Sequence, residues 1–404
     1  MDLYEIFVTI LCLAIGYFLG SINPAYFFGR YKGVNLREVG TKNLGTVNVY
    51  KTLGLKYAIP TAFYDGLKGL FVVAIAFILG VNIYIAQICG LLTIVGHVFP
   101  FYINFRGGQG VAAAAGMLLY YLLYYFIQNF LFFFFFFYLI LIVVIFEYIT
   151  KIGNLLAPMV LPLLAYYIWV NFPGDIFNVF FTLILAHITS IGLYNVVNRH
   201  LIKIENENFQ AHWWRVAARP FAILFVVFYA FEPKLNSLIF IGIVTLIFIV
   251  FDLYRFIHKQ ADDLIRTKVK ALLRSNEIKK FSSMTIFLVS LFITFLLFIK
   301  EIAIVSSVIL IFGDSFGKIF GLAFGRHKFH DKSLEGSLAI SGCMLIVGYV
   351  LYTIIPIPLP ILVFGCISAP VIEFFSMRIN DNLTVPLITG SIMTAAYFFT
   401  GLLV

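Results

Sequence analysis

A loop near the N-terminus concentrates hydrogen-bond donors. Residues 39–51 read V-G-T-K-N-L-G-T-V-N-V-Y-K and combine glycines with hydroxyl, amide and ammonium groups. Glycines let a backbone approach a ligand closely, and successive backbone N–H groups can cradle a phosphate. A basic turn at the inner face of a membrane would have the same composition. The loop therefore indicates either a phosphate site or a charged connection, and its candidate residues are Gly40, Thr41, Asn43, Gly45, Asn48 and Lys51.

Two ionisable residues follow inside an apolar stretch. Asp65 and Lys68 are three residues apart, so on a helix they share one face. Ionisable groups in a membrane span are costly unless they are paired or functional. The pair, with Gly69 beside it, is expected to belong to a binding site or to form a structural ion pair.

A histidine and a glycine-rich run come next. His97 lies in G-H-V-F-P, and Arg106, Gly107, Gly108, Gln109 and Gly110 follow directly before another apolar stretch. Exposed backbone amides at the start of a helix favour an anion. His97 is accordingly expected at an anion site, although a lone histidine in an apolar span is also a common packing residue.

These blocks must be positioned by membrane helices. The chain has 404 residues, of which 62% are hydrophobic and only 12% charged, compared with about 25% charged residues in soluble domains. This composition excludes a soluble enzyme. Apolar stretches of about 20 residues recur along the whole chain, and they predict an all-α, polytopic membrane protein with about fourteen spans. One predicted span covers about 301–313, with a polar connection at 314–333.

The basic residues predict the orientation of the chain. With the N-terminus outside, every Lys and Arg falls in an inner connection except Lys68, Lys234 and Lys300, as the positive-inside rule requires. The net charge of +9 therefore reflects orientation in a cell membrane, and no nucleic-acid partner is expected. Gly, Asn and His also gather in the inner connections, so the active sites are expected on the cytoplasmic side.

The three N-terminal blocks resemble, in order, spacing and residue type, the bacterial acyl-phosphate:glycerol-3-phosphate acyltransferases. The resemblance covers about residues 1–200 and implies a seven-helix fold. It implies that a fatty acyl phosphate donates its acyl group to glycerol-3-phosphate, giving lysophosphatidate without a metal, coenzyme A or another cofactor. By this resemblance Thr41, Lys51 and His97 are catalytic. The substrate-binding and phosphate-binding residues would be Gly40, Asn43, Gly45, Asn48, Asp65, Lys68, Gly69, Arg106, Gly107, Gly108, Gln109 and Gly110.

The chain departs from this family's pattern at several positions. The family loop reads G-S-G-N-x-G-A-T-N-x-x-R, whereas this chain has Thr41 for Ser, Lys42 for Gly, Val47 for Thr and Lys51 for Arg. Thr41 keeps the hydroxyl and Lys51 keeps the charge, but a lysine lacks the bidentate fork of arginine. Gln109 stands where the family carries a lysine. Phosphate positioning is therefore expected to be weaker.

The second half of the chain carries its own charged blocks. Glycines, basic residues and carboxylates lie between Gly313 and Ser337 and fit a nucleotide phosphate with Mg²⁺, whose usual protein ligands are carboxylate oxygens. The charges between Asp252 and Glu277 can also be read as a solvated run. Glu373 lies within an apolar span, where a charge indicates either a site or a structural pair. The candidates are Asp252, Arg255, Arg274, Glu277, Asp314, Lys332, Glu335, Glu373, Asp381 and Asn382.

Taken together, these C-terminal blocks resemble the CTP-dependent dolichol, phytol and diacylglycerol kinases, which are related to the phosphatidate cytidylyltransferases. The resemblance covers about 215–404. It implies that CTP phosphorylates a lipid alcohol or diacylglycerol. By this resemblance Asp314, Glu335 and Asp381 would hold Mg²⁺, while Lys332, Arg255 and Arg274 would bind nucleotide phosphates.

The sequence thus predicts two fused helical bundles of phospholipid synthesis. The expected division is an acyltransferase-like domain at 1–200, an interfacial linker at 201–217 and a lipid-kinase-like domain at 218–404. One alternative is that only the C-terminal half is active and the N-terminal half is a lipid-binding remnant. The other is a lipid or anion transporter, although most polar clusters lie at inner helix ends rather than at mid-membrane.

Overall fold

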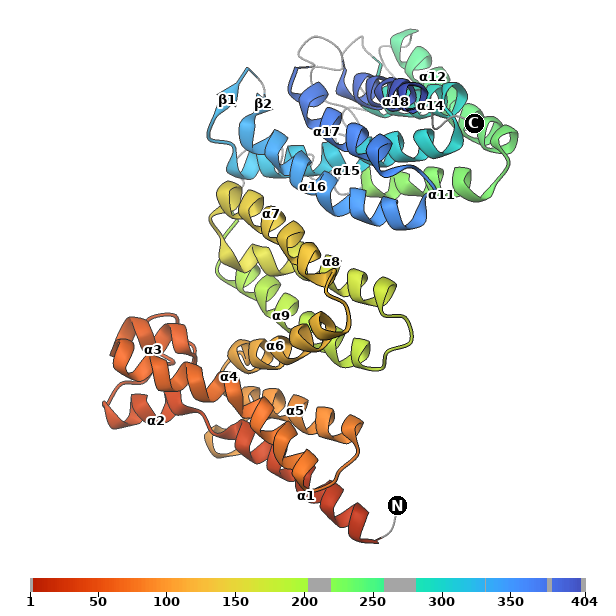
Figure 1. Cartoon of the computed structure of the whole chain (residues 1–404). Helices are drawn as coiled ribbons and strands as arrows, with labels where there is room; N and C mark the ends of the chain where they lie inside the picture. Colours follow the sequence, from red (N-terminus) through yellow and green to blue (C-terminus); the bar gives the residue numbers. More distant parts are fainter. Residues whose placement is uncertain (1–2, 203–218, 258–280, 331, 376–379, 401–404) are drawn as a thin grey trace. The chain divides into compact units, whose positions relative to one another are not determined.

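The computed structural model describes residues 3–202, 219–257, 281–330, 332–375 and 380–400. The chain forms two compact units. The first contains Met1–Ile140 and Gly153–Leu201, and the second contains Leu141–Ile152 and Ile202–Val404. The described part is helical apart from one two-stranded hairpin (Figure 1). The expected all-α membrane fold is confirmed.

The helices have the lengths that membrane spans need. In the described residues, eleven helical segments are long and apolar enough to cross a membrane, and three shorter apolar helices cover Arg219–Phe231, Ser283–Leu297 and Leu359–Phe375. The outside position of the N-terminus remains a prediction. The linker expected at 201–217 lies, beyond residue 202, outside the described residues.

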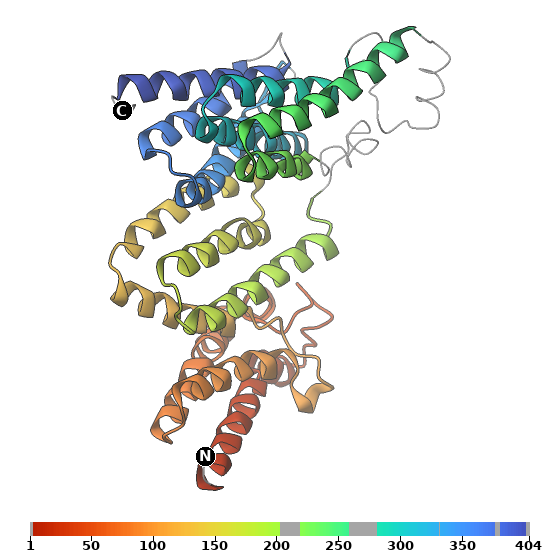
Figure 2. The same ribbon diagram turned by 90° about the vertical axis from the view of Figure 1, so that its right-hand side faces the viewer.

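The first unit begins with a broken helix. The break after Ser21 has a local cause: Asn23 caps the next helix by accepting from the Tyr26 N–H, and Pro24 occupies the first helical position. α1 lies alongside α4 and α5 (Figure 2). The elements of this unit are α1 (Leu3–Ser21), α2 (Pro24–Tyr31), α3 (Thr46–Leu53), α4 (Leu55–Ile78), α5 (Ile83–Val98), η1 (Phe101–Ile103), α6 (Val111–Gln128), the start of α7 (Phe132–Thr150), α8 (Gly153–Asn171) and α9 (Phe177–Asn198).

The helix α7 is shared between the two units. Its first part is apolar on every face because of a run of six phenylalanines, whereas Glu147 is exposed near its end. In the first unit, the Phe135 ring stacks on Tyr167 with centroids 3.8 Å apart. In the second unit, Phe146 packs against Phe316 and Phe320.

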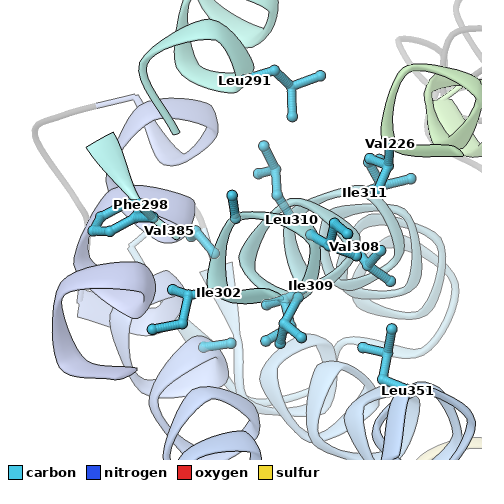
Figure 3. Close-up of a cluster of buried hydrophobic side chains, with 14 of the residues drawn as sticks. Val226, Leu291, Phe298, Ile302, Val308, Ile309, Leu310, Ile311, Leu351 and Val385 are labelled. Carbon is cyan, nitrogen blue, oxygen red and sulfur yellow. The ribbon is translucent and has the colours of Figure 1, made fainter. Parts of the chain in front are cut away.

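The second unit is built around one buried helix, α15. Every residue from Ile302 to Ile311 is buried, and side chains from the neighbouring helices surround this stretch (Figure 3). The elements of this unit are η2 (Arg219–Ala222), α11 (Ile223–Phe231), α12 (Lys234–Ile257), α14 (Ser283–Leu297), α15 (Lys300–Phe324), β1 (Lys328–Phe329), β2 (Lys332–Ser333), α16 (Leu334–Ile354), α17 (Leu359–Phe375) and α18 (Asp381–Phe399).

The sequence prediction was wrong about where this central helix ends. The span expected at 301–313 continues to Phe324, so Asp314 and Lys318 lie on a helix and not in a connection. Both charges are accommodated because the Lys318 ammonium donates to Asp314 one turn away, at 2.6 Å.

Replacing Ile309 by Ala is expected to lower the thermal stability of the full chain in detergent. Ile309 is 1% exposed in the middle of α15, and a cavity in a packed core costs about 2–5 kcal/mol. The matched control is Ile243→Ala on α12, where the side chain is 56% exposed. Equal losses of melting temperature in the two variants would contradict the central position of α15.

Candidate active site

The helices α1 and α5 pack closely against each other, and the position of His97 depends on this packing. A Cβ on Gly20 would lie 2.5 Å from the Thr93 Cα, and one on Gly16 would lie 2.6 Å from the Cys89 carbonyl oxygen. Gly96 on α5 meets the α1 backbone in the same way. Small residues at these positions let the two backbones touch. The contact brings the end of α5, with His97, next to the end of α1.

Three side chains and one carbonyl meet at this point. Lys68 on α4 donates to the Asp65 carboxylate at 3.0 Å and to the Gly20 carbonyl at 2.9 Å, and its nitrogen lies 2.7 Å from Nδ1 of His97. Asp65 is 0% exposed, Lys68 1% and His97 2%. The opposite charges of Asp65 and Lys68 compensate each other, which makes their burial tolerable.

Nδ1 of His97 contacts two groups of opposite kind. It lies 2.7 Å from the Lys68 nitrogen and 3.2 Å from the Asp65 carboxylate. A lysine ammonium has three donors and no acceptor. When Nδ1 accepts from this ammonium, the neutral imidazole carries its proton on Nε2, and His97 can donate a hydrogen bond through Nε2.

The glycine-rich run folds back along the end of α5. The Gly107 N–H donates to the Val98 carbonyl at 2.8 Å, and the Gly108 N–H donates to the His97 carbonyl at 3.1 Å. A Cβ on Gly108 would collide with Nε2 of His97 and with the Leu44 carbonyl. Glycine is therefore required here so that the chain can pass the imidazole.

Asn48 organises the loop before α3. Its side-chain amide donates to the carbonyls of Leu36, Val39 and Asn43, and its side-chain oxygen accepts from the Thr41 N–H at 2.7 Å. This side chain is 1% exposed. Asn48 thus positions the loop, and its hydrogen-bonding groups are occupied by the loop itself.

A cavity of about 560 Å³ opens between these elements. Its polar wall is formed by Thr41, Asn43 and Thr46 from the loop and α3, together with Asp65 and His97. Apolar side chains line the cavity as well, namely Ala112, Ala115, Ala157, Ile188 and Ile191, and Gln109, Asn154, Asn195 and Arg199 complete its polar lining. The cavity therefore suits a ligand with one polar and one apolar end.

Two buried polar atoms in the cavity wall lack partners. Among the described residues, the second carboxylate oxygen of Asp65 and the hydroxyl of Thr46 have no hydrogen-bond partner. Unsatisfied buried polar groups are costly, and each one calls for an explanation. A polar ligand in the cavity would satisfy both groups.

Gln109 was predicted at the site, but Asn154 and Asn195, which line the same cavity, were not. Gln109 and Asn195 exchange hydrogen bonds of 2.8 and 3.2 Å, and Asn154 lies 3.5 Å from the Asn195 amide. His187 also contacts the Gln109 carbonyl at 3.0 Å. Asn154 and Asn195 are polar residues inside apolar spans. The same feature of the sequence indicated Asp65, and it could have indicated these two residues.

The structure brings part of the predicted set to the cavity. Seven predicted residues line it: Thr41, Asn43, Gly45, Asp65, His97, Gln109 and Gly110. Three further predicted residues contact His97 without lining the cavity: Lys68, Gly107 and Gly108. Gly69 packs against Met117. Gly40 lies against the Asn48 side chain. Lys51 and Arg106 are exposed and do not line the cavity, so their roles at a phosphate stay predictions.

A second polar cluster lies in the second unit. Arg219 pairs with Asp314, which also accepts from Lys318. Lys332 pairs with Glu373 and Asp381, each at 3.1 Å. Asn382 accepts from Arg219 at 3.3 Å. Asp314, Glu373 and Asp381 line one small cavity, so the structure does bring these three predicted residues together.

Glu335 lies apart from this cluster. It accepts from the backbone N–H groups of Arg326 and His327 and lies 2.6 Å from the His327 ring, so it holds the β1–β2 hairpin against α16. No group of three or more His, Cys, Asp or Glu suited to a metal occurs within the described ranges. The trio expected for Mg²⁺, Asp314, Glu335 and Asp381, is therefore not assembled as one ligand set.

The remaining predicted residues of this half have other surroundings. Asp252 pairs with Arg255 at 3.0 Å and accepts from the Ser282 N–H and the Thr285 hydroxyl, each at 2.7 Å. It thereby ties the end of α12 to the start of α14. Arg274 and Glu277 lie outside the described residues.

An apolar cleft of about 490 Å³ runs beside the polar cluster. Leu141 and Ile145 of α7, Met344 of α16 and Phe374 of α17 line it. Ser337 lines it as well, and its hydroxyl donates to Glu373 at 3.3 Å. A hydroxyl in the lining of the cleft is therefore bonded to a carboxylate of the polar cluster.

Comparisons with known proteins cover the first half of the chain. The model of the glycerol-3-phosphate acyltransferase family matches residues 10–204. Glycerol-3-phosphate acyltransferase 1 of Deinococcus radiodurans is 40% identical over 104 residues, which are 26% of this chain and 52% of the relative. The acyltransferase of Sinorhizobium fredii is 44% identical over 105 residues, 26% of this chain and 51% of the relative. The chain spans about half the length of these curated relatives.

A solved structure is also similar to this half. It is the crystal structure of PlsY (YgiH), an integral membrane glycerol 3-phosphate acyltransferase, in its glycerol 3-phosphate form. It shares 28% sequence identity with this chain at a TM-score of 0.36, covering 48% of this chain and 92% of the other. The N-terminal half of the chain, residues 10–204, thus matches the glycerol-3-phosphate acyltransferase family.

Proposed function

We propose that the first unit transfers an acyl group from an acyl phosphate to the hydroxyl of glycerol-3-phosphate. The products are lysophosphatidate and inorganic phosphate. The observation that carries this proposal is the buried contact of Asp65, Lys68 and His97 at the wall of a cavity that both polar and apolar side chains line. The family match of residues 10–204 supports it.

The cavity accommodates both ends of such substrates. The acyl chain would lie against the alanines and isoleucines of α6, α8 and α9. The phosphates would face the loop and the first turn of α3, where Gly45 is the N-cap and no side chain caps the helix. Uncapped backbone N–H groups at a helix start favour an anion. The Thr41 and Thr46 hydroxyls add donors on the same side.

We assign to His97 the tautomer in which Nδ1 accepts from Lys68, and we infer the roles in the reaction from it. The substrate hydroxyl oxygen attacks the acyl carbon, and the bond from that carbon to the phosphate oxygen breaks. His97 donates from Nε2 to the oxyanion that forms on the carbonyl. The unpartnered oxygen of Asp65 accepts a hydrogen bond from the attacking hydroxyl. The departing phosphate takes the hydroxyl proton, because Nδ1 of His97 is engaged by Lys68.

The substitution of the family lysine by Gln109 is accommodated in this scheme. Gln109 exchanges hydrogen bonds with Asn195, so its side chain stiffens the wall of the cavity without adding charge. The phosphate would then lose one cationic partner, and weaker phosphate binding would raise KM more than it lowers kcat.

Asp65→Asn is expected to lower kcat at least about a hundredfold, because the amide puts a donor where the attacking hydroxyl needs an acceptor. Formation of labelled lysophosphatidate from palmitoyl phosphate and labelled glycerol-3-phosphate measures this effect. The matched control is Asp175→Asn: Asp175 bonds to the Tyr124 hydroxyl at 2.8 Å and lies outside the cavity lining. Equal activity of Asp65→Asn and the wild type would contradict the proposed role of Asp65.

For the second unit we propose CTP-dependent phosphorylation of a lipid alcohol or diacylglycerol. The supporting observation is an apolar cleft with Ser337 in its lining, because this serine donates to Glu373 of the polar cluster that also contains Lys332, Lys318 and Arg219. A lipid chain would occupy the cleft, and its hydroxyl would donate to Glu373. The hydroxyl oxygen would attack the γ-phosphorus of CTP, and CDP would leave. The expected Mg²⁺ trio does not fit, since Glu335 is held by the hairpin.

Two alternative functions, a chain in which only the second unit is active and a lipid or anion transporter, predict different assay results. If only this second unit is active, CTP-dependent transfer persists while no lysophosphatidate forms at any acyl length. A transporter would show neither product and would move a labelled anion or lipid across a vesicle membrane.

Glu373→Gln is expected to reduce phosphate transfer from γ-labelled CTP to dioctanoylglycerol or a long isoprenoid alcohol by at least about a hundredfold. The matched control is Glu147→Gln on the exposed face of α7. Lipid phosphorylation that is undiminished in Glu373→Gln would contradict the assigned role of Glu373. A folded wild type that labels neither alcohol would exclude the kinase activity for these two substrates.

A further inference from the structure

The first unit contains a second cavity, of about 410 Å³, outside the proposed active site. It lies between α2 and the segment that leads to α3, and its lining includes Tyr26, Arg30, Arg37 and Leu44. None of its lining residues lines the active-site cavity. A ligand here would therefore not occupy the proposed acyl-transfer site.

This cavity is positively charged. Arg30 and Arg37 both line it, and none of the described residues in its lining is acidic. The nearest carboxylate in sequence, Glu38, is held by the Asn35 side chain. Arg30 is exposed and Arg37 is half-buried, so the cavity presents its positive charge to anions that arrive from solution.

Arg37 supplies an unsatisfied donor. Its Nη2 is buried and has no hydrogen-bond partner among the residues that the structure describes. A buried guanidinium nitrogen without an acceptor is costly, and an oxyanion is the partner that its planar fork suits best. The guanidinium of Arg30 lines the same cavity, and hydrogen bonds from a guanidinium to an oxyanion are charge-assisted.

We propose that this outer cavity, lined by Arg30 and Arg37, binds a phosphate group. A phosphate dianion matches the two cationic side chains in charge, whereas a carboxylate would balance only one of them. The phosphate can come from the headgroup of an anionic lipid or from free inorganic phosphate. Both sources present the same oxyanion to the arginines.

The outer cavity shares a loop with the active site. Leu36 and Leu44 line the outer cavity, whereas Thr41 and Asn43, between them in sequence, line the active-site cavity. Asn48 joins the two sides, because its amide donates to the Leu36 carbonyl at 2.7 Å and its side-chain oxygen accepts from the Thr41 N–H. A phosphate in the outer cavity would hold this loop in place from the opposite face.

Equilibrium dialysis of the full chain in detergent against labelled inorganic phosphate tests the proposal. Arg37→Gln is expected to lose one bound phosphate per chain, and Arg30→Gln to weaken the same site by about tenfold. Arg37→Lys keeps the charge and should bind more strongly than Arg37→Gln. The matched control is Lys56→Gln, which removes an exposed positive charge outside both cavities.

The outcomes separate this proposal from the proposed acyl transfer, since binding is measured without acyl donor. Unchanged phosphate stoichiometry in Arg37→Gln, in protein that elutes and melts like the wild type, would overturn the outer site. Displacement of the bound phosphate by dihexanoyl phosphatidate at much lower concentrations than by inorganic phosphate identifies a lipid headgroup. Displacement by inorganic phosphate at equal or lower concentrations identifies free phosphate.

Discussion

The buried ammonium of Lys68 is the constraint on which the first unit depends. It joins α4 to the carbonyl end of α1 through Gly20, and to α5 through His97, while Asp65 neutralises it. A charge in this position cannot be left unpaired inside a membrane. One of these contacts places the ammonium 2.7 Å from Nδ1 of His97, where it favours the tautomer with the proton on Nε2. The packing of α1, α4 and α5 and the orientation of His97 therefore both depend on Lys68. Lys68 acts by positioning Asp65 and His97, which line the cavity.

The sequence predicted which segments form this site, but not which residues line the cavity and which only hold the loop in place. Asp65 and His97 were expected near a phosphate, and both line the cavity. Asn48 came from the same loop, yet it serves the loop and not the ligand, because its four hydrogen bonds form only when the chain turns back on itself. Such contacts depend on tertiary structure, and spacing along the chain does not reveal them. Asn195 was missed for the same reason, since its partner Gln109 lies far away in sequence.

In the second unit the composition predicted the helices well and their ends poorly. The polarity of Asp314 suggested that a span had ended, whereas the helix continues because Lys318 and Arg219 pair with that carboxylate. Glu335 had the residue type of a metal ligand, but the fold uses it to hold a hairpin. The sequence left open whether Glu373 belongs to a functional site or to a structural ion pair. In the structure it pairs with Lys332, and the apolar cleft beside this pair is the observation that favours a functional site.

The most direct measurement is nitrogen-15 magnetic resonance of the labelled histidines in lipid, with His97→Gln used to assign the His97 signal. In the wild type we expect a neutral imidazole with its proton on Nε2, and in Lys68→Met we expect this signal to change. A proton on Nδ1 in the wild type, or a His97 signal that does not respond to the loss of Lys68, would contradict the positioning role of Lys68.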